Sequence, residues 1–513
     1  MGSSDGHPFQ PDASFDGGNL DCGNGLLLLI RKHLDPLQRG QLLEIRSSES
    51  SVQEDLPAWA RLTGNELVST VRRVDHASYL VCKGRLAERS GQAAPVAPAA
   101  RPTTPVARTG EAPTLSSRST VIPPLAVMGI GSWPRPRWLL RSLHEYLEGR
   151  MPEAEFQESA DDAVRLAVAA QMRAGVDVVT DGEQRRDSYA SFIGSRLDCC
   201  QLIPITDLLP YVEDPAEFEA SLRSLDVPAE LVRHPAVLKP LRRNRPLVLH
   251  EVQALAPLTD RPLKVALPGP YLLTRTLWLE CVSERVYRER DDLAADVVRL
   301  LREEIQDLLA AGVALVQLDE PVLTEVVFGR PTHNRSFMCG ALSERRSANE
   351  ELAFAADLLD RVAAGFPAER LAMHVCRGNW SRDEGVALSG DYGPLLPLLE
   401  RTPFGTVFLE LCTPRAGELE QLRSLPARCR IGVGAVNQKL DHIETEADIL
   451  QRGEQAIGLF GPDRVLLNPD CGFATFADNP VASAEVAERK LASLVSAARE
   501  LRRRHGLVAP HGS

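Results

Sequence analysis

Four side chains of the kinds that bind metal ions lie near the ends of short apolar segments in the second half of the chain. They are His374, Cys376, Glu410 and Cys471. His374 and Cys376 are two residues apart in "LAMHVC", so on a β-strand their side chains point to the same face. An imidazole, two thiolates and a carboxylate suit Zn²⁺ better than Ca²⁺ or Mg²⁺. The sequence therefore predicts a zinc enzyme.

The fourth ligand of this set has two candidates. Catalytic zinc sites keep one position open for substrate, and a carboxylate such as Glu410 could yield to an incoming thiol. Cys412 lies two residues after Glu410, on the same face of a strand, and is the alternative ligand.

Two further carboxylates, Glu183 and Asp319, also end apolar segments. Asp319 could bind the ammonium group of a substrate, or it could cap a helix that starts at the following proline. Glu183 could likewise bind a substrate, or it could have only a structural role in which Arg185 and Arg186 neutralise its charge. Because charge at the end of a buried strand is typical of a functional site, we expect both to be candidate catalytic residues.

Eight apolar segments could place these side chains as strands. They are residues 126–132, 176–183, 263–270, 313–320, 371–376, 406–412, 430–437 and 464–471. Helical patterns fill most of the gaps, for example at 291–312, 348–365 and 479–504, while 248–255 is expected to form a hairpin-like excursion. This alternation predicts an α/β fold, a (β/α)8 TIM barrel whose strand C-termini converge on one face. An open doubly wound sheet is the alternative, but no glycine-rich phosphate loop follows the first strand.

The overall composition excludes some classes of binding partner and indicates the cellular compartment. A net charge of -12 argues against nucleic-acid or anionic-membrane partners. No apolar run approaches transmembrane length, and the first residues lack the features of a signal peptide. We expect a cytoplasmic protein whose ten cysteines are thiols and ligands rather than disulfides.

An Ala/Pro/Thr-rich segment divides the chain. Residues 91–120 contain almost no large apolar side chain and are expected to be a flexible linker between a small domain, 19–90, and a large one, 121–506. Residues 1–18 and 507–513 are expected to be disordered.

The large domain resembles the catalytic barrel of the cobalamin-independent methionine synthase family. The matching motifs, in family order, are "IGS" (130–132), "DGEQRRD" (181–187), "QLDEP" (317–321), "HVC" (374–376), "LE" (409–410) and "NPDCG" (468–472). The resemblance implies that the four predicted ligands bind zinc. It also implies that an amino-acid thiol is held by Ile130, Ser132, Glu183 and Asp319.

The implied reaction is the transfer of a methyl group to a thiol, with homocysteine as the expected acceptor and methionine as product. Zinc lowers the pKa of a bound thiol and so makes it nucleophilic. Lys439, in "VNQKLDH" (436–442), takes the position of the family's proton-donor histidine and is a candidate catalytic residue. The methyl donor is therefore open between a methyl-corrinoid and a methyl-folate. "HVCRGNW" (374–380) also resembles other thiol alkyltransferases.

Residues 19–90 resemble a TusA-type sulfur carrier, which implies a small two-layer α/β domain. Cys22 lies near the predicted start of its first helix, where the helix dipole favours a thiolate, although no proline follows this cysteine. Cys22 could carry sulfur to a relay partner, or the domain could serve only structure or docking. If Cys22 carries a persulfide, the alternative function is a sulfur transferase whose zinc site activates the delivered sulfur.

Overall fold

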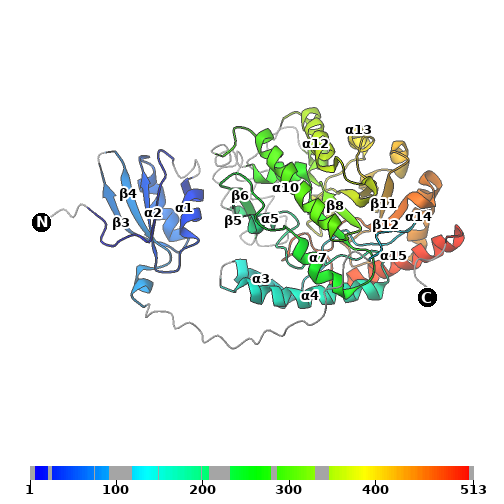
Figure 1. The fold of residues 1–513 in the computed structure, drawn as a ribbon, viewed down its shortest axis with the longest axis horizontal. Coiled ribbons are helices and arrows are strands. Elements are labelled where there is room, and N and C mark those ends of the chain that lie inside the picture. Colours follow the sequence, from blue (N-terminus) through cyan, green and yellow to red (C-terminus); the bar gives the residue numbers. More distant parts are fainter. Residues whose placement is uncertain are drawn as a thin grey trace. The chain divides into compact units, whose positions relative to one another are not determined.

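The computed structural model describes residues 6–20, 26–73, 75–91, 118–147, 150–197, 199–206, 232–278, 286–329 and 346–507 (Figure 1). The chain divides into two compact units, Met1–Glu111 and Ala112–Ser513. Cys22, residues 92–117 of the predicted linker and residues 508–513 of the predicted tail lie outside the described residues. No helix in the described part is long and apolar enough to cross a membrane.

The first unit contains a four-stranded sheet in the order β1-β2-β4-β3, in which β1 and β2 are parallel and the other pairs antiparallel. The strands are β1 (Ala13–Asp16), β2 (Leu42–Ser47), β3 (Glu66–Arg72) and β4 (Ala77–Cys82). The helices are α1 (Leu26–Leu34) and α2 (Val52–Leu62). Apolar side chains of both helices share one core with β1, β2 and β4.

Two elements of this unit differ from the sequence-based expectation. β1 lies inside the segment 1–18 that we expected to be disordered, because Phe15 is buried in the core beside Leu26 and Leu43. β3 carries no apolar pattern from which a strand could be predicted, because its side chains are only partly buried or exposed.

The second unit has a parallel sheet of six strands in the order β12-β11-β10-β9-β8-β7. The strands are β7 (Lys264–Pro268), β8 (Leu315–Asp319), β9 (Leu371–Val375), β10 (Thr406–Leu409), β11 (Arg430–Val436) and β12 (Val465–Pro469). Nearly every residue in them is buried, as expected for a parallel sheet covered by helices. The unit therefore has a mixed α/β fold built on a parallel sheet.

The first two predicted strands of this unit, 126–132 and 176–183, are not regular strands. They contribute only isolated parallel bridges: Val127 pairs with Leu467, Met128 with Val178, and Val179 with Leu263. The Asp177 side chain accepts a hydrogen bond from the Val127 backbone at 2.8 Å, which replaces part of a strand ladder.

Helices alternate with the strands and pack against them, with α10, α14 and α15 contacting β8, β11 and β12 respectively (Figure 1). The longer helices are α3 (Arg137–Leu147), α4 (Glu153–Ala174), α8 (Pro270–Leu277), α10 (Arg290–Ala310), α12 (Ala348–Ala363), α14 (Glu446–Phe460) and α15 (Ala484–Arg504). The shorter ones are α5 (Ile193–Arg196), α7 (Leu249–Leu255), α11 (Val322–Phe328) and α13 (Leu396–Leu399). A separate antiparallel pair is formed by β5 (Cys200–Pro204) and β6 (Arg233–Val237).

The prediction of a hairpin-like excursion at 248–255 is wrong, because α7 occupies this segment. Its buried residues Val252 and Leu255 are three apart, and Glu251, also buried, pairs with Arg186. This spacing is that of a short amphipathic helix rather than of alternating strands.

Candidate metal centre and adjoining pocket

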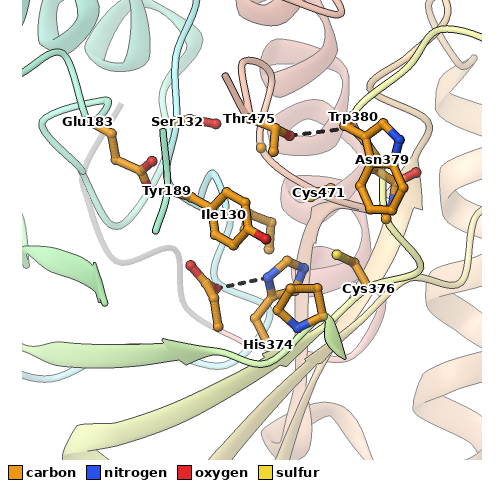
Figure 2. Close-up of a pocket in the computed structure, with 14 residues that line it drawn as sticks. Ile130, Ser132, Glu183, Tyr189, His374, Cys376, Asn379, Trp380, Cys471 and Thr475 are labelled. Atoms are coloured by element: carbon orange, nitrogen blue, oxygen red, sulfur yellow. Dashed lines mark hydrogen bonds and ion pairs between the residues drawn. The ribbon is translucent and has the colours of Figure 1, made fainter. Parts of the chain in front are cut away.

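Three of the four predicted metal ligands lie together at one end of the parallel sheet (Figure 2). His374 is on β9, Cys376 follows directly after it, and Cys471 follows β12. The ligand atoms of these three side chains all lie within 4.8 Å of one another, and all three residues are buried. Parallel strands of similar register bring these distant positions together.

The two ring nitrogens of His374 have different surroundings. Nδ1 lies 3.0 Å from Oδ1 of Asp319, which is opposite His374 in the register of β8 and β9. Nε2 is buried and has no hydrogen-bond partner among the described residues. Burial lowers the pKa of His374, but Asp319 and the Cys376 thiolate more than offset this and raise it. A histidine held by a carboxylate at one nitrogen, with the other free, is typical of metal sites.

The thiols of Cys376 and Cys471 interact with each other. A hydrogen bond between them lowers the pKa of Cys376 and raises the pKa of Cys471, which favours a state of the pair with one proton. Metal binding would replace this proton, since thiols bind metals as thiolates. One imidazole nitrogen with no other partner and two sulfurs together fit a zinc ion.

Glu410 is buried near this group but is engaged elsewhere. Its Oε2 accepts hydrogen bonds from Asn379 Nδ2 at 2.6 Å and from the Arg377 backbone at 3.1 Å. Its Oε1 forms an ion pair with Arg415. Neither Glu410 nor the alternative ligand Cys412 belongs to the described group of side chains within 4.8 Å.

A pocket adjoins this candidate metal-binding group (His374, Cys376 and Cys471) and is lined by all four residues that the resemblance assigned to the amino-acid substrate (Figure 2). Besides the three possible ligands, it is lined by Ile130, Ser132, Glu183, Tyr189, Asp319, Pro321, Gly378, Asn379, Trp380, Gly472 and Thr475. The structure thus places two carboxylates and a possible metal site around one space.

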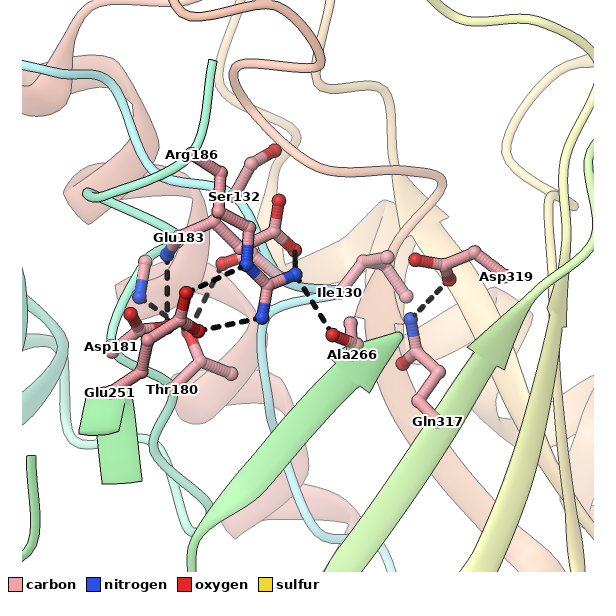
Figure 3. Close-up of polar contacts among 12 residues, drawn as sticks. Ile130, Ser132, Thr180, Asp181, Glu183, Arg186, Glu251, Ala266, Gln317 and Asp319 are labelled. Carbon is pink, nitrogen blue, oxygen red and sulfur yellow. Dashed lines mark hydrogen bonds and ion pairs between the residues drawn. The ribbon is translucent and has the colours of Figure 1, made fainter. Parts of the chain in front are cut away.

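Glu183 is held in a strained backbone conformation, with φ at 54°, which is uncommon for a residue other than glycine. Its Oε1 lies 3.8 Å from Arg186, whose guanidinium also pairs with Glu251 (Figure 3). Its Oε2 is buried with no hydrogen-bond partner in the described structure. Burial raises the pKa of Glu183 to about 7, a rise that Arg186 opposes and Asp319 adds to. Such a carboxylate is suited to bind a cation.

Lys439 is buried but does not line this pocket. Its Nζ lies 3.8 Å from Glu384 Oε2 and makes no hydrogen bond to any described residue. Burial lowers the pKa of its ammonium group, and nearby Arg415 lowers it further.

Sequence reasoning missed several residues of the site. Tyr189 and Trp380 lie in loops that line the pocket, where no periodic pattern marks them. Lys264 and Gln317 lie beneath it as isolated polar residues within the apolar strands β7 and β8. That interruption of an apolar segment was the available signal.

Comparison with known proteins agrees with this arrangement. Residues 125–500 match the family model described as "Cobalamin-independent synthase, Catalytic domain". A methionine synthase from Saccharolobus solfataricus is 26% identical over 74% of this chain and 96% of its own length. One from Sulfolobus acidocaldarius is 26% identical over 70% of this chain and 87% of its own length. The solved structure of a B12-independent methionine synthase from Shewanella sp. W3-18-1, in complex with selenomethionine, has the same fold, with a TM-score of 0.57 and 23% identity, covering 74% of this chain and 99% of that one.

Proposed function

The chain belongs to the cobalamin-independent synthase catalytic-domain family, and from this premise we propose that it is a zinc-dependent methyltransferase that methylates the thiol of homocysteine to form methionine. One observation carries the proposal: a nitrogen and two sulfurs that fit a metal ion face the same pocket as two buried carboxylates. The possible metal site fits the thiol of a substrate, and the two carboxylates fit the ammonium group of an amino acid.

His374, Cys376 and Cys471 would hold the zinc ion. The ion would act as a Lewis acid and lower the pKa of a coordinated substrate thiol. As a fourth ligand, Glu410 would have to share or exchange its present partners, Arg415, Asn379 and the Arg377 backbone. If Glu410 keeps these partners and does not bind the ion, the fourth position is left to the substrate.

The chain's own residues would orient the amino acid. The ammonium group would bind between Glu183 and Asp319, whose carboxylates both face the pocket, while Ile130 and Ser132 would contact the rest of the substrate. Holding the thiol at a fixed place relative to the donor converts a bimolecular reaction into an effectively unimolecular one. Buried walls around the pocket limit the access of water to the nucleophile.

We also propose that the second unit is a (β/α)8 barrel, with segments 126–132 and 176–183 in the places of the first two strands. The isolated bridges support this, because they link β12 to Val127, Met128 to Val178, and Val179 to the residue before β7. The fold of the Shewanella protein supports it as well. The methyl donor stays open between a methyl-corrinoid and a methyl-folate, and the roles of Lys439 as a proton donor and Cys22 as a sulfur carrier stay predictions.

The test is to incubate the zinc-loaded full chain with homocysteine and, separately, methylcobalamin or 5-methyltetrahydrofolate, and to detect methionine by mass spectrometry. Methionine from either donor is expected. Cys471→Ser should lose both zinc and activity, whereas Cys429→Ser, at a buried cysteine outside the metal-binding group, should keep both. Bound zinc with no methionine from either donor would refute the proposal.

A further inference from the structure

Lys264 is a buried lysine at the start of β7, beneath the pocket and outside its lining. Its Nζ donates hydrogen bonds to the carbonyl oxygen of Ile130 at 2.8 Å and to Gln317 Oε1 at 2.7 Å. The ammonium group also lies 4.6 Å from the centre of the Phe408 ring. Burial of an ammonium group costs free energy unless such partners replace its hydrogen bonds to water. The presence of Lys264 at this position therefore indicates a specific role.

A continuous row of hydrogen bonds runs from Lys264 to the metal-binding group across three neighbouring strands, β7, β8 and β9. Gln317 Nε2 donates to Asp319 Oδ1 at 2.7 Å, as Figure 3 shows. The same oxygen is 3.0 Å from His374 Nδ1. Every member of the row is buried.

With Lys264 protonated, Asp319 ionised and His374 neutral, the order of donors and acceptors in this row allows only one arrangement. Burial lowers the pKa of Lys264 to about 7, and the nearby carboxylates of Asp319 and Glu183 oppose this drop. An ammonium group can only donate, so the Gln317 amide must turn its oxygen to Lys264 and its NH₂ to Asp319. The Asp319 carboxylate can only accept, so the proton of neutral His374 must be on Nδ1. The lone pair of His374 is then on Nε2, the nitrogen that is buried without a hydrogen-bond partner among the residues that the structure describes.

We infer that Lys264 is a positioning residue that acts through Gln317 and Asp319 to hold His374 in its metal-binding tautomer. Through its second hydrogen bond it also fixes the Ile130 carbonyl at the pocket wall. A single side chain thus supports both the metal-binding group and the amino-acid pocket. The inference rests on the proposed zinc site, and metal affinity tests it without any assay of the reaction.

The first test measures zinc affinity of the full chain by competition with a chromophoric chelator. Lys264→Met keeps most of the length of the side chain and removes the donor. Gln317→Glu keeps the partner of Lys264 but turns an acceptor toward Asp319. Each should weaken zinc binding several-fold, which is less than the loss of about 10- to 100-fold typical of removing a direct hydrogen-bond partner of a ligand, because both act through Asp319.

Lys490→Met is the matched control. Lys490 is also fully buried, but its ammonium group bonds to Glu444 and to the His442 carbonyl, outside the row. This variant should lose stability, seen as a lower Tm, and keep the zinc affinity of the wild-type chain. The comparison separates loss of a buried lysine in general from loss of this one.

A second measurement reads the tautomer directly. The ¹⁵N chemical shifts of His374 in the metal-free full chain, assigned with a His374→Gln variant, should show the proton on Nδ1 in the wild type and a mixture in Gln317→Glu. Wild-type zinc affinity in a folded Lys264→Met, or an unchanged tautomer in Gln317→Glu, would overturn the inference. Failure of the wild-type chain to bind zinc would instead refute the proposed function.

Discussion

Asp319 and His374 lie opposite each other on neighbouring parallel strands, and Asp319 Oδ1 is 3.0 Å from His374 Nδ1. Asp319 also lines the pocket, so one carboxylate faces both a possible metal ligand and a possible substrate. The register of β8 and β9 creates this relationship, since a shift by one residue would turn one of the two side chains to the opposite face of the sheet.

Replacing this carboxylate should therefore affect both functions. Asp319→Asn keeps the shape but removes the charge, and its amide can present a donor to His374. We expect zinc affinity to fall about 10- to 100-fold and methionine affinity to fall as well. Chelator competition and isothermal titration calorimetry would measure the two. Asp177→Asn, at a buried aspartate paired with Arg502, should lower stability while leaving both affinities unchanged.

The ionisation of Glu183 should control binding of the amino-acid product. Because burial raises the pKa of Glu183 to about 7, its carboxyl group is largely neutral below that pH and cannot pair with an ammonium group. Because methionine has no ionisable side chain, the side chain of the ligand does not contribute to the pH dependence. The affinity of the protein for methionine should therefore rise between about pH 6 and about pH 8 as Glu183 loses its proton. Calorimetry over this range would measure the effect. In Glu183→Gln the affinity should be lower and nearly independent of pH, and an unchanged pH profile would argue against this role.

The lack of a side chain at Gly131 makes room for the Glu183 carboxylate. A Cβ atom at this position would lie 2.1 Å from Glu183 Oε1, so Gly131→Ala should push the carboxylate away from its place. We expect methionine affinity to fall by about tenfold, since a hydrogen bond to a charged group contributes roughly 1.5 kcal/mol. Zinc affinity should stay the same. Gly129→Ala is the control, because a Cβ there meets nothing within 4 Å, and an equal loss in both variants would contradict the prediction.

Glu410 and Cys471 should contribute unequally to zinc binding. Glu410 is held by Arg415 and Asn379, whereas Cys471 belongs to the group whose ligand atoms lie within 4.8 Å of one another. Glu410→Gln should therefore weaken zinc binding much less than Cys471→Ser does, as measured by chelator competition. Equal losses would show that Glu410 is a full ligand, as the family resemblance implies.

Much of the parallel sheet could be predicted because its strands are buried on both faces and read as apolar segments. β7 to β12 all fall within predicted segments. Segments 126–132 and 176–183 read the same way but form only bridges, since tertiary contacts such as that of Asp177 with the Val127 backbone decide how long a strand continues. The short helix α7 was missed because seven residues give too little periodicity to separate a helix from a strand.

In the candidate site, local sequence indicated which side chains could act but not which partner each one selects. His374 lies on a strand, Cys376 and Cys471 follow strands, and all three could be identified from residue type and position. The ion pair between Glu410 and Arg415 depends on how the loop after β10 folds back, which no local pattern reports. The same holds for Lys264, whose partners come from two other segments of the chain.

The row of hydrogen bonds beneath the pocket also constrains how related sequences can vary. Along this row, Lys264 donates a hydrogen bond to Gln317, and Gln317 donates one to Asp319. If one residue changes from a donor to an acceptor, the hydrogen-bonding role of the next residue must also reverse. Replacement of Lys264 by an acceptor would favour a turned amide at Gln317 and place an acceptor against Asp319. Relatives that keep His374 should therefore keep all three residues or exchange them together.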